Sequence, residues 1–305
     1  MQVCTTRSFI LSTESLEAVM AKMRTEPNLR SQWLGEKMRD LRKACGVSQA
    51  DAADYIQRDA TMLGRYENGT FPFRRVDVLG LLTLYGVDDQ KLRDGLVEIC
   101  DEAWRKDWWD EHRKDLGTDF IDVPWLESRT ERICTYQHLL VYGLFQTRPY
   151  AEAVINRLEH GRASAAQIDR WIDLRMERQQ ILEADSARRI DVALEEAVLH
   201  RTVGSARVMR GQLQRLLETS GRPGITIRII PTEHGPHAGL NGSFELFTMP
   251  EPYPAVAYVE TTGGSLYLEA PKVRNFEVVW DDLDRSALSE KRSVDLIAKR
   301  LKEIR

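Results

Sequence analysis

Two short helices joined by a very tight turn, in residues 46–69, constrain the fold of this chain more than any other feature. The segment reads GVSQADAADYIQRDATMLGRYENG. Ser48 is placed to cap the first helix, with Asp51 three residues later as an acidic version of the capping box. Asp59 is placed to cap the second helix, which leaves only QRD for the turn, and Gly69 supplies the stop. The pattern predicts two compact helices held at a fixed angle.

Three more helices are expected around this pair. One precedes it and ends at Gly46, a fourth follows in FPFRRVDVLGLLTLYGV, and a fifth continues from Asp88. Five short helices with a three-residue turn between the second and third are typical of a helix-turn-helix domain. An arbitrary helical bundle is the alternative that spacing alone leaves open. Helical spacing assigns inward positions to Leu34, Met38, Leu41, Cys45, Leu63, Tyr66, Val76, Leu79, Leu82 and Leu84.

The charge of the chain is an objection to a nucleic-acid partner, because the formal net charge is −4 at pH 7. Net charge describes the whole molecule, however, whereas phosphate contact needs only one basic face. Over residues 31–86 eight Lys and Arg stand against seven Asp and Glu, a balance of +1. Local charge therefore gives weak support to a nucleic-acid interface in this region.

The remainder of the chain predicts an α+β domain. After the polar segment EHRKDLGTDF, which is typical of a linker, helical patterns are interspersed with segments of strand length such as ITIRIIP and GSFELFTM. We therefore expect a mainly α N-terminal domain, a five-helix helix-turn-helix, followed by an α+β domain with a small sheet. The expected boundaries are 1–30 for an N-terminal extension, 31–87 for the helix-turn-helix domain, 88–118 for a connecting helix and linker, and 119–305 for the α+β domain.

Composition indicates a cytoplasmic protein without membrane contact, and a DNA partner would make it nucleoid-associated. No apolar run approaches the roughly 20 residues needed to span a bilayer. The first residues lack the long apolar segment of a secretion signal, and Met20 or Met23 is an alternative start. The four cysteines lie far apart, which argues against a zinc site or a disulfide framework and fits a reducing cytosol.

No catalytic constellation emerges from the sequence. Glu233, His234 and His237 lie close together, but not in the spacing H-E-x-x-H. A loop with incidental histidines is the favoured interpretation, and a metal-dependent hydrolase is the alternative. We expect no enzyme activity, no cofactor and no metal.

Aromatic residues gather near the beginning of the α+β domain. Rings with nearby polar groups suit ligand pockets and protein interfaces, whereas any one ring taken alone more often fills a core. We expect a possible pocket or interface here and retain core packing as the alternative. The loop GPHAGLNGSF would act as a mobile flap or a partner-binding segment. The residues assigned to this site are Trp125, Tyr136, Tyr142, Phe145, Tyr150, His234 and His237.

Residues 34–87 resemble the repressor-like helix-turn-helix domains of the XRE family, which share the fold of the lambdoid phage repressors. The motifs GVSQADAADYI and RYENG carry the resemblance. It implies double-stranded DNA as the partner and a structural ion pair of Arg42 with Glu67 that ties the first helix to the third. The DNA-contacting positions that it implies are Gln49, Asp59, Ala60, Thr61, Gly64, Arg65, Asn68 and Thr70, after which Arg74 and Arg75 could clamp the phosphates.

These positions differ in what they offer to DNA. Gln49 matches a phosphate anchor at a helix N-terminus. Arg65 is the best single base reader, because a guanidinium can grip guanine O6 and N7 together; a solvated surface arginine is the alternative. Asp59 would repel phosphate and suits a cap better. Ala60 and Gly64 offer no hydrogen-bonding side chain, so backbone contacts and DNA shape would carry more of the recognition.

The second part of the chain, about residues 119–301, resembles a C-terminal domain of undetermined biochemistry that actinobacterial regulators commonly carry behind an XRE-type helix-turn-helix. LLVYGLFQTRPYA, IRIIPTEHGPHAGLNGSFELF and YVETTGGSLYLE are among the segments that carry the resemblance. Relatives usually have Pro where this chain has Tyr142. Such regulators are often encoded beside a small partner protein, and some are described as antitoxin-like or as developmental repressors.

We therefore expect a sequence-specific DNA-binding transcriptional regulator whose C-terminal domain senses a ligand or partner, dimerises, or both. A homodimer on two half-sites is expected, because one helix-turn-helix buries too little surface for tight specific binding. The alternative is an antitoxin-like interaction module that sequesters a small neighbour-encoded partner protein.

Overall fold

A computed structural model describes residues 28–105, 122–159, 161–183 and 188–304 of this chain. The chain divides into a compact unit that ends at Arg105 and a second that begins at Lys106. The predicted linker EHRKDLGTDF and nearly all of the predicted N-terminal extension lie outside the described residues. The predicted fold class, a helical N-terminal part followed by an α+β part, is confirmed.

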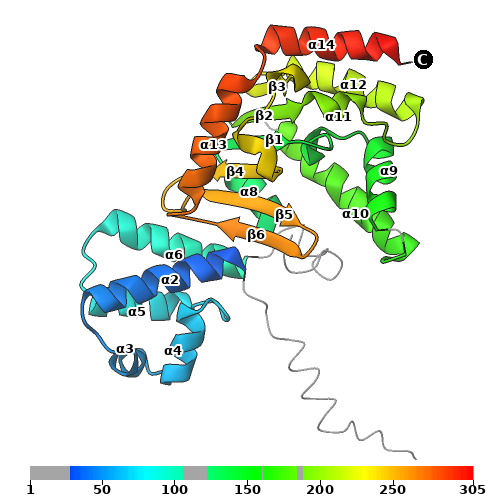
Figure 1. Cartoon of the computed structure of the whole chain (residues 1–305). Coiled ribbons are helices and arrows are strands. Elements are labelled where there is room, and N and C mark those ends of the chain that lie inside the picture. Colours follow the sequence, from blue (N-terminus) through cyan, green and yellow to red (C-terminus); the bar gives the residue numbers. More distant parts are fainter. Residues whose placement is uncertain (1–27, 106–121, 160, 184–187, 305) are drawn as a thin grey trace, which may run out of the picture. The chain divides into compact units, whose positions relative to one another are not determined.

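Five described helices form the first unit, and Figure 1 shows α3 and α4 together at one end of it. The sequence prediction places the fifth helix in a connecting segment, but α6 packs against α2 and α5 and so is part of the unit. The helices are α2 (Leu29–Ala44), α3 (Gln49–Tyr55), α4 (Ala60–Glu67), α5 (Arg75–Leu84) and α6 (Gln90–Trp104).

The caps form where the sequence places them. The Ser48 hydroxyl accepts a hydrogen bond from the Asp51 N–H at 3.1 Å, and the Asp59 carboxylate accepts one from the Met62 N–H at 2.7 Å. The Asp51 carboxylate accepts from the Ser48 hydroxyl at 2.6 Å rather than reaching the backbone as in the usual capping box. These bonds satisfy N–H groups that helix starts leave unpaired, and so they fix where α3 and α4 begin.

Helices α2 and α4 approach so closely that only glycine fits at two positions. A Cβ on Gly35 of α2 would lie 2.5 Å from the Tyr66 carbonyl oxygen and 2.9 Å from that of Glu67. Gly69, just past α4, has φ +68°, and a Cβ there would lie 2.7 Å from Gln32 Cα. The C-terminal end of α4 is therefore pressed directly onto the backbone of α2.

Part of the predicted core of this unit is wrong. Val76 is 68% exposed and Leu79 is 39% exposed, whereas Val78, Leu81 and Leu82 are fully buried. The residues of α5 that face α6 and α3 set the buried stripe, and a sequence such as VLGLLTL, with Thr83 as its one polar residue, does not reveal which stripe that is.

The last two predicted core residues of the first helix, α2, are also not fully buried. Leu41 is only half-buried, and Cys45 is exposed because α2 stops at Ala44 and leaves Cys45 as its C-cap. The predicted positions Leu34, Met38, Leu63 and Tyr66 are buried.

A six-stranded mixed sheet forms the second unit, with strand order β3-β2-β1-β4-β5-β6. Strands β1, β2 and β3 are parallel, and β4, β5 and β6 continue the sheet in antiparallel pairs. The strands are β1 (Arg132–Gln137), β2 (Arg189–Glu195), β3 (Ile225–Ile230), β4 (Phe244–Thr248), β5 (Val256–Thr261) and β6 (Gly264–Leu268). The helices are α8 (Asp122–Arg129), α9 (Arg148–Leu158), α10 (Ala165–Arg178), α11 (Glu196–His200), α12 (Ala206–Ser220), α13 (Val273–Ser286) and α14 (Glu290–Glu303), with short 3₁₀ helices η2 (Gly143–Phe145), η3 (Gln179–Leu182), η4 (Thr232–His234) and η5 (Ala238–Asn241).

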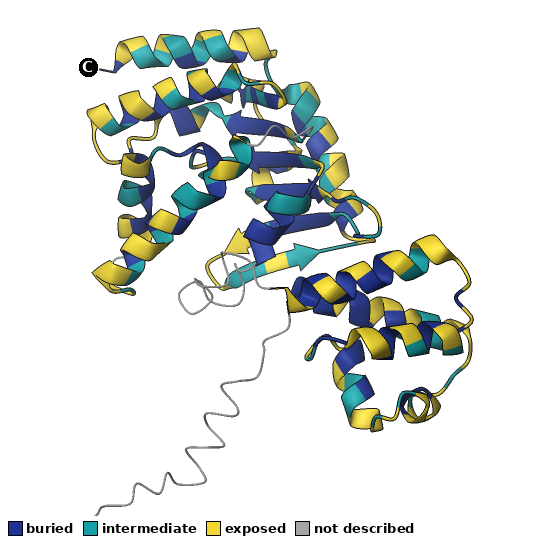
Figure 2. Cartoon of the chain, turned by 180° about the vertical axis from the view of Figure 1, so that it is seen from behind, coloured by how far each residue is buried: buried dark blue, intermediate teal, exposed yellow. Residues whose placement is uncertain are grey.

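The core of this unit lies on both faces of the sheet, as the buried strands in Figure 2 show. Alternation along the strands sends one set of side chains toward α13, where Tyr136, Phe244, Trp280 and Leu283 belong to one buried cluster. The alternate set carries buried polar groups as well as apolar ones, and Glu245 of β4 is the most consequential of them.

Helix α14 protects the outer edge of β3. The Leu288 N–H donates to the Ile229 carbonyl at 2.8 Å, and the Ile229 N–H donates to Ser293 Oγ at 3.0 Å. Both backbone groups of Ile229 that point away from the sheet are thus satisfied. The contact fixes the start of α14 beside the carboxyl end of β3.

Replacing Gly35 by Ala should destabilise the first unit by about 1–3 kcal/mol or more, because the new methyl group would overlap backbone oxygens that cannot move alone. Urea unfolding followed by circular dichroism measures the change. The matched control is Gly80→Ala in α5, where a Cβ would meet Ile56 at an ordinary 3.4 Å. That variant should gain up to about 1 kcal/mol from helix propensity. Equal stability of the two variants would contradict the close approach.

Candidate functional site

The outer face of α4 is open to solvent. Asp59, Ala60, Thr61 and Arg65 are all exposed. Within the part of the chain that the structure describes, the Arg65 guanidinium has no hydrogen-bond or ion-pair partner. Helix α4 is 8 residues long, and its inner residues Leu63, Tyr66 and Glu67 are buried. Their burial fixes the position of the helix and therefore of its outer face.

Gln49, the first residue of α3, lies against Gly64 of α4. A Cβ on Gly64 would lie 3.1 Å from the Gln49 Nε2 atom, which is tighter than an ordinary contact. The missing side chain at Gly64 therefore lets the start of α3 approach α4. Of the predicted DNA-contacting positions, the structure brings Gln49, Gly64 and Thr61 to neighbouring points of one α3–α4 surface.

A buried ion pair ties α4 to α2, at the two residues that the resemblance pairs. Arg42 Nε lies 2.6 Å from Glu67 Oε1, and Arg42 Nη2 lies 2.9 Å from Glu67 Oε2. The Arg42 guanidinium also donates to the Val47 carbonyl at 3.1 Å, and hydrogen bonding to Glu67 raises the pKa of Arg42. A second arginine, Arg39, donates to the Glu67 carbonyl and to Asn68 Oδ1. The Asn68 amide oxygen is thus already engaged within the protein.

A second buried carboxylate fixes the turn between α3 and α4. Asp77 of α5 accepts from the Tyr66 hydroxyl at 3.0 Å and from Arg58 Nε at 3.1 Å. Burial, with the nearby Asp77 charge, raises the pKa of Tyr66 to about 12. Sequence reasoning missed this network, because an acid in the first turn of a helix is ordinary there. The available signal in the sequence was the predicted turn QRD, which contains Arg58. In the structure Gln57 of this turn has a φ of +56°.

The remaining predicted contacts lie after α4 and differ in how free they are. The Thr70 hydroxyl donates to the Arg65 carbonyl at 3.1 Å, which closes the end of α4. Arg74 is exposed and is the N-cap residue of α5. Arg75 forms an exposed ion pair with Asp101. Arg74 is therefore better placed than Arg75 to meet a phosphate.

The five predicted aromatic residues do not line an open pocket or an exposed interface. Trp125, Tyr136, Tyr142, Phe145 and Tyr150 are each at most 1% exposed. Trp125 packs edge-on against Tyr253, and Tyr142 packs edge-on against Phe145. The core-packing alternative describes these rings, because a run of mixed aromatic and polar residues does not show which residues the chain covers.

The predicted histidine loop is anchored rather than free. His237 Nε2 lies 2.8 Å from Glu195 Oε1, and the Tyr136 hydroxyl donates to the same oxygen at 2.8 Å. His237 Nδ1 accepts from the Gly239 N–H at 3.2 Å, which leaves the ring proton on Nε2 to donate to Glu195. A Cβ on Gly239 would lie 2.8 Å from both Tyr136 and Leu283, so the loop is packed tightly onto the sheet.

This geometry does not support the alternative of a metal-dependent hydrolase. Glu233 and His234 are exposed, whereas the His237 ring turns inward to Glu195. Among the described residues, no group of three His, Cys, Asp or Glu side chains is arranged to hold a metal ion. The expectation of a flap in this loop is likewise not supported, because Ala238 also donates to Asp282 at 3.0 Å.

A buried carboxylate lies on the other face of the sheet. Glu245 accepts a hydrogen bond from the Tyr142 hydroxyl at 3.1 Å. Burial, together with the charge of Glu127, raises the pKa of Glu245 to about 8, although Arg178 opposes the shift. Glu127 itself is paired with Arg178 at 2.8 and 2.5 Å. Glu245 is therefore the group in this polar core that is protonated near neutral pH.

Two family models match the chain, one for each unit. A model described as a helix-turn-helix domain matches residues 33–95. A model described as a domain of unknown function (DUF5753) matches residues 120–299, which is more than half of the chain. Comparisons with curated proteins and with solved structures gave no match. The described helices include none with the length and apolarity to cross a membrane.

Breaking the buried pair by Glu67→Ala should cost about 3–5 kcal/mol of stability in the first unit, because Arg42 would keep a poorly hydrated charge without its partner. Asp101→Ala, which breaks the exposed pair with Arg75, should cost at most about 1 kcal/mol. Chemical denaturation of both variants provides the comparison. Similar losses in the two would show that Glu67 does not anchor α4.

Glu245→Gln should change how stability depends on pH. The folded-state pKa is raised from its ordinary 4.5 to about 8, so the contribution of Glu245 is complete below 4.5 and is lost as pH rises toward 8. The free energy of unfolding of the variant, relative to that of the wild type, should therefore rise by at most about 1.4 kcal/mol per pH unit over this window. Urea unfolding from pH 5 to 8 measures the difference. Exposed Glu277→Gln is the control and should track the wild type; a Glu245 variant that does the same would refute the assignment.

Proposed function

This chain belongs to the family defined by the domain of unknown function (DUF5753), and we propose that it regulates transcription by binding DNA through the helix-turn-helix domain that precedes that domain. The observation that carries the proposal is the outer face of α4. Thr61 and Arg65 are exposed there, and Arg65 has no partner among the described residues. A helix presented in this way can enter the major groove.

Base readout in this proposal is sparse and rests on two side chains. Arg65 pairs with the O6 and N7 atoms of a guanine, and Thr61 contacts a thymine methyl or a phosphate. Ala60 and Gly64 have no polar side chain to offer, and Asp59 is occupied as the cap of α4. DNA shape and backbone contacts therefore supply much of the remaining specificity.

Backbone contacts come from both sides of α4. Gln49 and the free N–H groups at the start of α3 approach one phosphate, and Arg74 approaches another. Arg39 engages only the amide oxygen of Asn68, so the Asn68 NH2 group can still donate to a phosphate, whereas Arg75 first has to leave Asp101. This division makes Arg74 a stronger phosphate contact than Arg75.

The finer features of the regulator belong to the same proposal. It is of the XRE type found in actinobacteria, acts in the cytoplasm, and binds two half-sites as a homodimer, because a single module buries little surface on DNA. The C-terminal unit senses a ligand or partner or holds the dimer together. An antitoxin-like module that sequesters a small protein is the competing function, and DNA binding with little dependence on salt would favour it.

Arg65→Ala should weaken binding to a cognate site by about 1–3 kcal/mol and relax the preference at one base pair. The site is first selected from random duplexes with the wild-type protein, and affinities are then measured by fluorescence anisotropy at several salt concentrations. Undiminished affinity of the variant would remove Arg65 from the readout.

Two controls separate base reading from charge. Arg74→Ala should weaken cognate and unrelated duplexes alike and lower the salt slope by about 1. Arg274→Ala changes an exposed arginine of α13 and should leave affinity unchanged. If no variant alters binding, α4 is not the surface that meets DNA.

A further inference from the structure

A pocket of about 420 Å³ lies at the carboxyl ends of two parallel strands in the second unit. Glu196 directly follows β2, Pro231 directly follows β3, and Glu233 lies in the short helix η4 that comes next. Helix α14 forms the opposite wall. Ligands of α/β sheets bind in crevices outside the carboxyl ends of parallel strands, and pockets of about 300–1,000 Å³ are typical of small-molecule sites.

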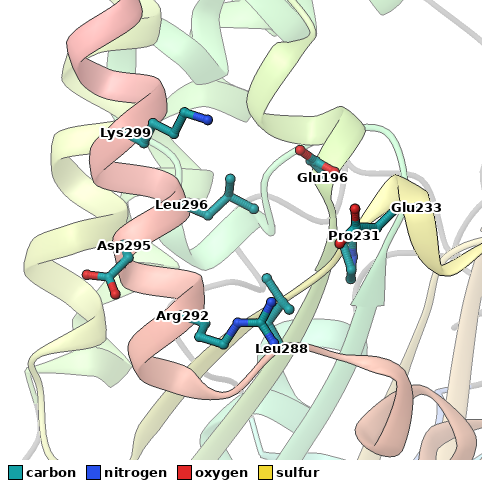
Figure 3. A pocket seen from close by; sticks show the side chains of 8 residues that line it. All are labelled: Glu196, Pro231, Glu233, Leu288, Arg292, Asp295, Leu296 and Lys299. Carbon is teal, nitrogen blue, oxygen red and sulfur yellow. The ribbon is translucent and has the colours of Figure 1, made fainter.

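Opposite charges line the two walls of this pocket. Figure 3 shows Arg292 and Lys299 extending from α14 toward the hollow, with Glu196 and Glu233 on the facing wall. Asp295 of α14 also lines the pocket, so this wall carries two cations and one acid. Arg292, Lys299 and Glu233 form no ion pair with any residue that the structure describes. Charges held apart in this way can each meet a group of opposite sign on a ligand.

Apolar side chains separate the two charged walls. Leu296 points into the hollow from α14, and Leu288 and Pro231 lie near it. Covering such a surface with an apolar group is favourable by roughly 25 cal/mol per Å² of buried apolar area. A ligand that fits the whole pocket therefore carries a cation and an anion with apolar atoms between them.

The walls are fixed before any ligand arrives. Ser293 binds the β3 backbone, and the Arg300 guanidinium donates to the Leu199 carbonyl at 3.2 Å, so α14 is held near both ends. Glu196 accepts from the Thr232 N–H at 2.9 Å, which fixes the facing wall. Preorganisation of this kind lowers the entropic cost of binding.

We propose that this pocket binds a short peptide with free ends, its carboxylate toward Arg292 and Lys299 and its ammonium group toward Glu196 and Glu233. Because these two cations lie seven residues apart on α14, about 10 Å along the helix, the carboxylate meets either one of them. The pocket has the size of a small-molecule site, and an extended peptide of two or three residues, which spans about 7–10 Å, places apolar side chains between its charged ends. This inference does not depend on the DNA-binding role of the first unit.

Isothermal titration of the full chain with leucyl-leucine, in the absence of DNA, tests the proposal. Saturable binding with one site per chain is expected. N-acetyl-leucyl-leucine and leucyl-leucine amide each lack one charge and should bind at least about tenfold more weakly, since a hydrogen bond to a charged group contributes about 1.5–3 kcal/mol.

Variants assign each charge to its wall. Arg292→Gln should weaken leucyl-leucine about tenfold and bind the amide no worse than the wild type does. Glu233→Gln should also weaken leucyl-leucine about tenfold and should bind the acetylated peptide no worse than the wild type does. Lys291→Gln removes an exposed cation of α14 that does not line the pocket and should bind normally. All three positions are exposed, and thermal unfolding confirms that each variant is folded.

The proposal is overturned if leucyl-leucine shows no saturable binding, if both blocked peptides bind as well as the free one, or if Arg292→Gln and Glu233→Gln leave binding unchanged. Because no DNA is present, none of these results bears on the role of α4. A failure of Arg65→Ala to alter DNA binding would likewise leave the pocket untouched.

Discussion

The contact of α4 with α2 is the interaction on which the proposed DNA-binding surface depends. At Gly35 the two backbones meet without any side chain between them, and the Arg42–Glu67 pair joins them at the next turns. Because the inner side of α4 is held by backbone contact and a buried charge pair, its outer side need not take part in folding. Thr61 and Arg65 are free to differ between proteins that share this scaffold.

The second unit uses the same principle with a different element. Gly239 lies against the Tyr136 ring, and His237 and Tyr136 share one oxygen of Glu195. These contacts hold the segment after β3 onto the end of the sheet. Glu196, which follows Glu195 directly, and Glu233, which belongs to this segment, form the wall of the proposed peptide pocket that faces α14. In both units a glycine permits a close approach, and a carboxylate fixes it.

Local signals in the sequence predicted the elements well, because caps and alternation act over a few residues. Ser48 and Asp59 cap α3 and α4 as predicted, and the alternating segments form strands. Contacts between distant residues were not predictable in the same way. Nothing near Asp77 in sequence announces Arg58 and Tyr66 as its partners, and the one polar residue of VLGLLTL, Thr83, does not define the outer stripe of α5. Local sequence likewise did not decide between a pocket and core packing for the aromatic residues, because their burial depends on distant contacts such as those of Trp125 with Tyr253 and of Tyr142 with Glu245.

The way α14 covers Ile229 has a consequence for synthesis of the protein. Helix α14 leaves the ribosome after every strand of the sheet, so β3 passes through a period with unpaired backbone groups and the apolar segment ITIRII along its border. Such borders recruit strands from other chains and start aggregates. A chain shortened before Leu288 would keep this vulnerability permanently, so we expect it to accumulate as insoluble material even though all six strands are present.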